Sequence, residues 1–241
     1  MLPISDMNPT RRFPLLNYLF IGINIAVFAW ELGLSEGQLQ AAFINLAVVP
    51  ADIMRNPFSL EAFLDILRSM FFHGGIAHIG GNMLYLWLFG DNVEDRFGKI
   101  LYFFVYMVSG FGAAIAQVLI NPNSQIPLVG ASGAIAGVLG AYFVFYPAVK
   151  VRGVVFLGYY MRSVQWPAWI VLGMWFVLQA LNGVASLCAV NAESGGVAFF
   201  AHIGGSVVGA VLSGLFSIVV PQPPREQRYE ALYERAQRYR F

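Results

Sequence analysis

Residues 198–220 read AFFAHIGGSVVGAVLSGLFSIVV, an apolar run of 23 residues that contains no Asp, Glu, Lys or Arg. A helix needs about 20 mostly apolar residues to cross the hydrocarbon core of a bilayer, so this run predicts a membrane span. The whole chain shares this character, because 58% of its 241 residues are hydrophobic and only 11% are charged. Ordinary soluble domains carry roughly a quarter charged residues. We therefore expect an all-α membrane domain.

Six segments qualify as spans once short polar or glycine-rich interruptions are allowed: 15–33, 76–92, 99–120, 132–149, 163–184 and 198–220. Orientation follows from the basic residues. With the N-terminus inside, 12 of the 14 Lys and Arg residues fall on the inner side, and only Arg55 and Arg68 fall outside. This bias predicts an even number of spans with both termini cytoplasmic.

We expect the chain to divide into a cytoplasmic N-terminal segment (1–14), a six-span domain (15–220) and a cytoplasmic basic tail (221–241). The first outer loop, 34–75, is long and apolar, and part of it has helical periodicity, in Leu60, Phe63, Leu64, Leu67 and Phe71. We expect an interfacial amphipathic helix there, so that the loop is partly embedded in the membrane. Cys188 is the only cysteine, which excludes an intrachain disulfide.

Polar groups inside spans are costly, and those that remain are candidates for function. The segment Gly130-Ala131-Ser132-Gly133-Ala134 begins the fourth span at its outer end. A serine there lies beside the unpaired N–H groups of a helix N-terminus, which favour the negative charge of an oxyanion. A purely structural role for Ser132, in capping or packing, remains open on this motif alone.

The segment Ala201-His202-Ile203-Gly204-Gly205 lies near the outer end of the sixth span. A lone histidine in an apolar helix is usually a packed residue. Two faces of small residues change this interpretation, one formed by Gly133 and Gly137 and the other by Gly205 and Gly209. If these faces pack together, Ser132 and His202 meet at similar depth, and His202 can take the serine proton.

His78 and Asn82 are four residues apart, so they share one face near the outer end of the second span. An imidazole and an amide there could donate hydrogen bonds to an oxyanion. We expect His73 to shape the turn before this helix. The alternative is a metal site built from His73, His78 and His202. However, His73 and His78 are five residues apart, which is out of register for a pair of ligands on one helix.

Taken together, these motifs resemble those of the rhomboid intramembrane proteases, in order and spacing: Phe72-His73-Gly74-Gly75, His78 with Asn82, Gly130-Ala131-Ser132-Gly133 and Ala201-His202-Ile203-Gly204-Gly205. The likeness covers roughly residues 13–220. It implies that Ser132 is the nucleophile, that His202 is the base, and that His78 and Asn82 form the oxyanion hole with the Ser132 backbone. It also implies a six-helix bundle with a water-filled cavity open to the outer side.

Two positions depart from the pattern of many rhomboids. Leu64 and Asp65 stand where a Trp-Arg pair is common, so the first loop must be anchored differently. Ala136 stands where a tyrosine often stacks on the catalytic histidine, so another group must hold His202. Glu193 is the only acidic residue near the outer ends of the last two spans, which predicts a Ser-His dyad instead of a full triad.

The resemblance implies an intramembrane serine endopeptidase that cleaves transmembrane protein substrates near the outer face. We expect the protein to contact membrane lipids and to lie in a bacterial-type cytoplasmic membrane. We expect no cofactor and no nucleic-acid partner, and the sequence does not indicate an oligomeric state. Trp175 and Phe176 in the fifth span are candidates for lipid-facing or gating contacts. The alternative is a non-catalytic rhomboid-like chaperone or a transporter, although a transporter would be expected to carry polar groups at the bilayer midplane.

Overall fold

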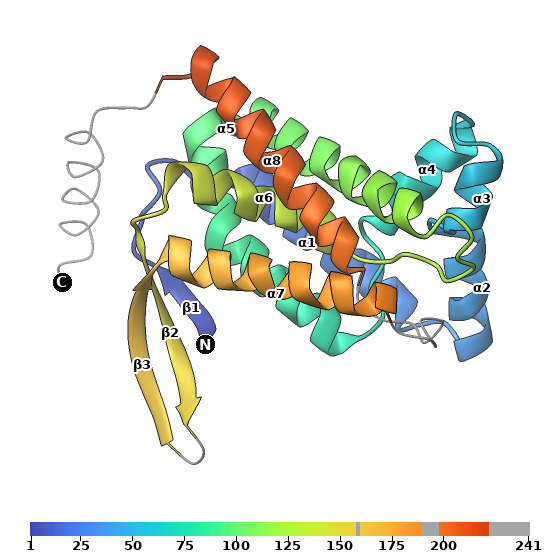
Figure 1. Ribbon diagram of the computed structural model, residues 1–241, viewed down its shortest axis with the longest axis horizontal. Helices are drawn as coiled ribbons and strands as arrows, with labels where there is room; N and C mark the ends of the chain where they lie inside the picture. The colour runs from blue at the N-terminus through green and yellow to red at the C-terminus, as the bar shows by residue number, and fades with distance from the viewer. Residues whose placement is uncertain (158–159, 189–197, 222–241) are drawn as a thin grey trace.

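The computed structural model describes residues 1–157, 160–188 and 198–221. Glu193 and residues 222–241 of the predicted tail lie outside the described residues. The described helices, labelled as in Figure 1, are α1 (Leu15–Glu31), α2 (Glu36–Leu46), α3 (Pro50–Arg55), α4 (Leu60–Ser69), α5 (Ile76–Ile120), α6 (Ser132–Phe145), α7 (Ala168–Cys188) and α8 (Phe199–Val219).

Helix α5 has 45 residues and contains the second and third predicted spans. Gly98 divides it, with φ 76° and ψ 170°, a conformation that glycine adopts at little steric cost. By length and composition, α5, α7 and α8 could each cross a membrane, while the apolar helices α1 and α6 have only 17 and 14 residues. The chain is therefore mostly helical, and the count of six spans with cytoplasmic termini stays a prediction.

The expectation of an all-α fold was wrong for two segments, which form a three-stranded antiparallel sheet. Its order is β1-β2-β3, with β1 (Leu2–Asp6), β2 (Lys150–Leu157) and β3 (Tyr160–Pro167). The fifth span was expected from residue 163, but Lys150 pairs with Pro167 and the helix begins only at Ala168. Valines and aromatic residues in this segment suit a strand as well as a span.

The sheet lies at one end of the helical bundle, and α2, α3 and α4 lie at the other (Figure 1). Arg11 pairs with Asp95 at 2.9 Å, and Arg96 donates to the carbonyl oxygen of Val220 at 2.6 Å, both at the sheet end. Arg55 and Arg68 belong to α3 and α4 at the opposite end. Arg11 and Arg96 thus lie at the opposite end of the bundle from Arg55 and Arg68, and which end is cytoplasmic stays a prediction.

The predicted amphipathic helix is confirmed as α4. Its first turn is capped by Ser59, whose Oγ accepts a hydrogen bond from the N–H of Ala62 at 3.0 Å. The side that faces the protein consists of Ala62, Ile66 and Ser69, all buried. Leu60 and Phe63 on the predicted apolar face are 73% and 52% exposed. This face is thus available to lipid, and its embedding in the membrane stays a prediction.

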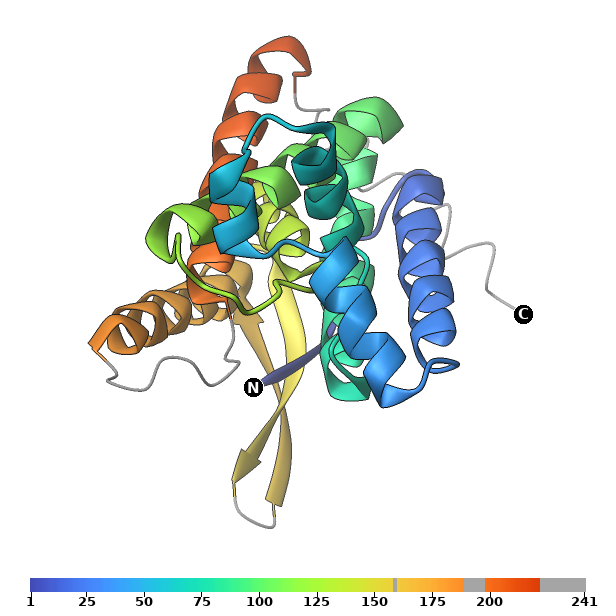
Figure 2. The same ribbon diagram turned by 90° about the vertical axis from the view of Figure 1, so that its right-hand side faces the viewer.

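Helix α6 is the innermost helix, with most of its residues between Gly133 and Tyr142 buried against α5 and α8. Helix α7 is peripheral. In its most apolar stretch of 18 residues only 17% of the residues are buried within the protein, against 39% in the corresponding stretch of α5. Figure 2 shows α7, in orange, leaning away from the other helices. The fold therefore encloses α6 tightly on two sides and leaves a looser boundary beside α7.

Candidate active site

The two small-residue faces predicted from the sequence do pack together. A Cβ atom added at Gly205 would collide with the carbonyl oxygen of Gly133, and one added at Gly209 would collide with the carbonyl oxygen of Gly137. Only glycine allows the backbones of α6 and α8 to approach so closely.

Ser132 is the first residue of α6, and His202 lies in the first turn of α8. Both line one cavity of about 680 Å³, together with His78 and Asn82 of α5. Three helices thus contribute the four polar side chains that the sequence singled out as catalytic or oxyanion-binding candidates. Trp175 of α7 and residues 126–129 of the loop before α6 complete much of the lining.

Gly130 brings His78 close to Ser132. Its φ of 133° lies in a region that L side chains rarely adopt. A Cβ there would also lie 2.8 Å from Nε2 of His78 and 3.5 Å from Oγ of Ser132. The imidazole edge and the hydroxyl therefore approach the same small space, which a side chain at position 130 would fill.

His78 and Asn82 are both oriented by neighbours. The N–H of Gly74 donates to Nδ1 of His78 at 3.4 Å, so a neutral His78 ring carries its proton on Nε2. Nδ2 of Asn82 donates to Nε2 of His73 at 3.0 Å, which leaves the second N–H of the Asn82 amide. Each side chain retains one donor, as an oxyanion hole requires.

His73 does not line the cavity but supports it from behind. Its Nδ1 donates to the carbonyl oxygen of Phe71 at 3.2 Å, which fixes Nε2 as the acceptor for Asn82. Its backbone N–H donates to Oε1 of Glu31 at 3.0 Å. Glu31 is 3% exposed at the end of α1, and it was not predicted from the sequence. The available signal was a lone carboxylate at the end of an apolar span.

Two residues of α7 hold His202, in place of the tyrosine expected from the resemblance. Nδ1 of His202 lies 2.8 Å from Oε1 of Gln179. The ring of Trp175, one helical turn earlier, lies with its centroid 5.7 Å from that of His202, at an interplanar angle of 37°. Trp175 therefore contacts the site, and Gln179 was missed although it is the only glutamine of α7.

The first loop is anchored through Ser69, in the absence of the Trp-Arg pair. Oγ of Ser69 accepts from the N–H of Val48 at 2.6 Å, and its carbonyl oxygen accepts from the N–H of Gly130 at 2.9 Å. The N–H of Leu128 donates to the carbonyl oxygen of Val48 at 2.8 Å. These bonds tie the first loop to the segment that delivers Ser132. Asp65 instead pairs with Arg68 at 2.7 Å.

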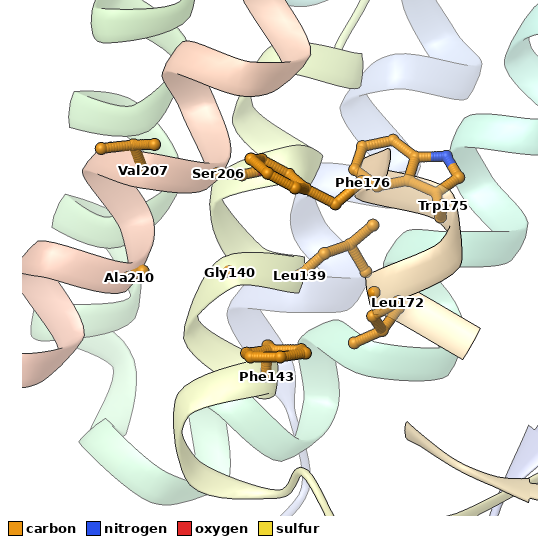
Figure 3. A pocket seen from close by; sticks show the side chains of 10 residues that line it. Leu139, Gly140, Phe143, Leu172, Trp175, Phe176, Ser206, Val207 and Ala210 are labelled. Carbon is orange, nitrogen blue, oxygen red and sulfur yellow. The ribbon is translucent and has the colours of Figure 1, made fainter. Parts of the chain in front are cut away.

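An apolar crevice of about 220 Å³ adjoins the cavity, between α6, α7 and α8. Leu139 and Trp175 line both spaces, so these two side chains separate the crevice from the polar cavity. In Figure 3 the ring of Phe176 points from α7 toward α8, across the crevice. The crevice thus marks the loose boundary of α7.

The alternative metal site gains no support from the donor set. Across residues 1–157, 160–188 and 198–221, no three His, Cys, Asp or Glu side chains gather closely enough to hold an ion. His73 instead uses its two ring nitrogens on Phe71 and Asn82.

Residues 61–218, well over half of the chain, match the family model described as the Rhomboid domain. The chain belongs to the rhomboid family. This confirms the resemblance drawn from the sequence motifs. It also makes the chain an integral membrane protein, in agreement with its long apolar helices.

Curated rhomboids from several sources are similar to this chain. It is 30% identical over 221 residues to Rhomboid protein 1, mitochondrial, of Saccharomyces cerevisiae, covering 90% of this chain and 57% of the yeast protein. It is 27% identical over 226 residues to Rhomboid protease AarA of Providencia stuartii, covering 87% and 75%. It is 32% identical over 129 residues to Rhomboid protease GluP of Bacillus subtilis, covering 53% and 24%.

The chain therefore spans little more than half the length of the yeast rhomboid that it matches. Because the similar rhomboids are mitochondrial as well as bacterial, they do not support the expected bacterial cytoplasmic membrane.

Proposed function

We propose that this rhomboid is an intramembrane serine endopeptidase with Ser132 and His202 as its catalytic dyad. One observation carries the proposal: Ser132, His202, His78 and Asn82 come from three helices and line a single cavity. The names of two similar proteins, both called rhomboid proteases, favour the same activity.

In the proposed reaction, Oγ of Ser132 attacks the scissile carbonyl carbon while Nε2 of His202 accepts the serine proton. The imidazolium then protonates the leaving amine. Water hydrolyses the acyl-enzyme by the reverse sequence of proton transfers, which regenerates the serine. The developing oxyanion would receive hydrogen bonds from His78, from Asn82 and from the backbone N–H of Ser132. This sequence requires no cofactor.

The substrates we propose are transmembrane segments whose helix unwinds near the outer face, because a peptide bond inside a helix is shielded by its own hydrogen bonds. We propose with it that the cavity opens to the outer side of a six-span domain with cytoplasmic termini. With Cys188 replaced, a single cysteine at the exposed Gln125 should react with an impermeant thiol reagent outside intact cells. One at Gln165 of β3 should not, and reversed labelling would contradict this orientation.

The second candidate is a non-catalytic protein that binds transmembrane helices in the same cavity. A fluorophosphonate probe separates the two, because it reacts with an activated serine. We expect the purified protein to be labelled and the Ser132→Ala variant to remain unlabelled. Absence of labelling in the folded wild type, together with no cleavage in a panel of single-span proteins, would favour the non-catalytic function.

A further inference from the structure

The contact between His202 and Gln179 decides which nitrogen of the histidine is available. A carboxamide oxygen only accepts hydrogen bonds, so the 2.8 Å approach of Oε1 of Gln179 requires a proton on Nδ1 of His202. In a neutral ring the lone pair is then on Nε2. Nε2 is the atom that must take the proton of Ser132 if the two residues form a dyad.

We propose that Gln179 is a positioning residue that fixes the tautomer and the orientation of His202. The inference deepens the proposed function and rests on it. In serine hydrolases with a full triad, a carboxylate on Nδ1 of the histidine serves this purpose. Here a neutral amide serves it, on an apolar helix where an ionised carboxylate would be costly. Trp175, one turn away on α7, fixes the plane of the ring.

The geometry gives Gln179 a role that packing alone does not explain. An apolar side chain of similar size would fill the same volume but would leave Nδ1 of His202 without an acceptor. The ring would then be free to carry its proton on Nε2, and in that form it cannot act as a base toward Ser132. The loss would fall on kcat, since Gln179 is not among the residues that line the substrate cavity.

A second glutamine, Gln117 of α5, provides a matched control, because it bonds to the backbone of α8 next to His202. Oε1 of Gln117 accepts a hydrogen bond from the backbone N–H of Ala201 at 3.2 Å, directly before His202. Gln117→Leu removes a buried amide beside the site but leaves the ring nitrogens of His202 untouched. It therefore reports what the loss of a structural hydrogen bond costs in this region.

The test compares Gln179→Leu, Gln179→Glu and Gln117→Leu in liposomes, with a transmembrane substrate. We expect Gln179→Leu to lower kcat by about 10- to 100-fold with little change in KM, by analogy with the orienting partners of metal-bound histidines. Gln179→Glu keeps an acceptor on Nδ1 and should restore most of kcat. Gln117→Leu should lower the melting temperature but leave kcat nearly unchanged.

A measurement independent of turnover completes the test. The chain has only three histidines, so ring ¹⁵N signals can be assigned by replacing His73 and His78 in turn. We expect the Nδ1–H tautomer for His202 in the wild type and in Gln179→Glu, and a shift toward Nε2–H in Gln179→Leu. An unchanged tautomer and unchanged kcat in a folded Gln179→Leu protein would overturn the inference. If the wild type does not cleave at all, the proposed function fails instead.

Discussion

Gly205 of α8 lies so close to the carbonyl oxygen of Gly133 on α6 that not even one methyl group fits between the two helices. Gly133 directly follows Ser132, and Gly205 lies about one helical turn after His202, so this contact sets how far apart the hydroxyl and the imidazole lie. Replacing Gly205 by alanine should force the helices apart. Overpacking of this kind typically costs about 1–3 kcal/mol.

We expect Gly205→Ala to lower the melting temperature in detergent and to reduce cleavage further, because a displacement of about 1 Å at a reacting group can cost about 100-fold in rate. Gly214→Ala on the same helix is the control, since a Cβ there meets nothing within 4 Å. Equal behaviour of the two variants would show that close packing at Gly205 does not set the geometry of the site.

The dyad itself predicts a non-additive pair of mutations. Ser132→Ala and His202→Ala should each abolish detectable cleavage, and the double variant should be no worse than either one, because two groups that act as a unit are lost together. Initial rates in liposomes measure this, with folding checked by thermal melting. Full activity in Ser132→Ala would rule out the mechanism.

Asn82 should show the smaller cost of a single oxyanion donor. Asn82→Ala removes the amide that lies between the cavity and His73. Loss of one such donor typically lowers kcat by about 10²- to 10³-fold, so residual cleavage should remain. Asn45→Ala is a suitable control, because Asn45 is exposed on α2 and its side chain donates to the carbonyl oxygen of Ala41 in the same helix. A silent Asn82→Ala variant would remove Asn82 from the oxyanion hole.

Much of the fold and site could be predicted because local sequence carries the signal. Apolar length predicts helices that can span a membrane, and glycines four residues apart predict a close helix contact. Ser132 and His202 stood out because each is a polar residue beside such a face. The structure shows the close helix contact itself, between Gly133 and Gly205 and between Gly137 and Gly209.

The missed features depend on partners far apart in the chain. Strand β1 pairs with β2 across more than 140 residues, and no local pattern in residues 2–6 predicts that pairing. Gln179 and Glu31 acquire their roles only where α7 meets α8 and where α1 meets the turn at His73. Each of these two residues is a polar side chain in an apolar helix, but only the tertiary contact reveals its partner.

The sheet contains a carboxyl group that should make stability depend on pH. Asp6 accepts hydrogen bonds from Tyr142 at 2.9 Å and from Asn92 at 2.8 Å. Burial, and secondarily the nearby charge of Asp91, raise the pKa of Asp6 to about 7. Because this pKa is higher in the folded state than in the unfolded chain, its contribution to stability is present at low pH and is lost as the pH rises through about 7.

Asp6→Asn removes this titration while keeping an oxygen acceptor for Tyr142. As the pH is raised from about 5 to about 8, across the raised pKa of Asp6, the melting temperature of the wild type should therefore fall relative to that of Asp6→Asn. Melting curves in detergent at both pH values measure the difference. Parallel pH dependence of the two proteins would mean that Asp6 does not titrate in this range.

The last prediction separates two neighbouring aromatic residues of α7. The sequence made both residues candidates for lipid-facing or gating contacts. In the structure the ring of Trp175 lies tilted beside that of His202, while Phe176 points across the lateral crevice. If outward movement of α7 limits substrate entry, Phe176→Ala should raise the rate of cleavage or leave it unchanged despite lost packing.

Trp175→Ala should lower kcat instead, because the His202 ring loses the face that holds it, and Trp175→Phe should recover most of the loss. Cleavage rates for the three folded variants decide between these roles. A strong loss of activity in Phe176→Ala would contradict gating at the crevice, and full activity in Trp175→Ala would show that the ring contact does not orient His202.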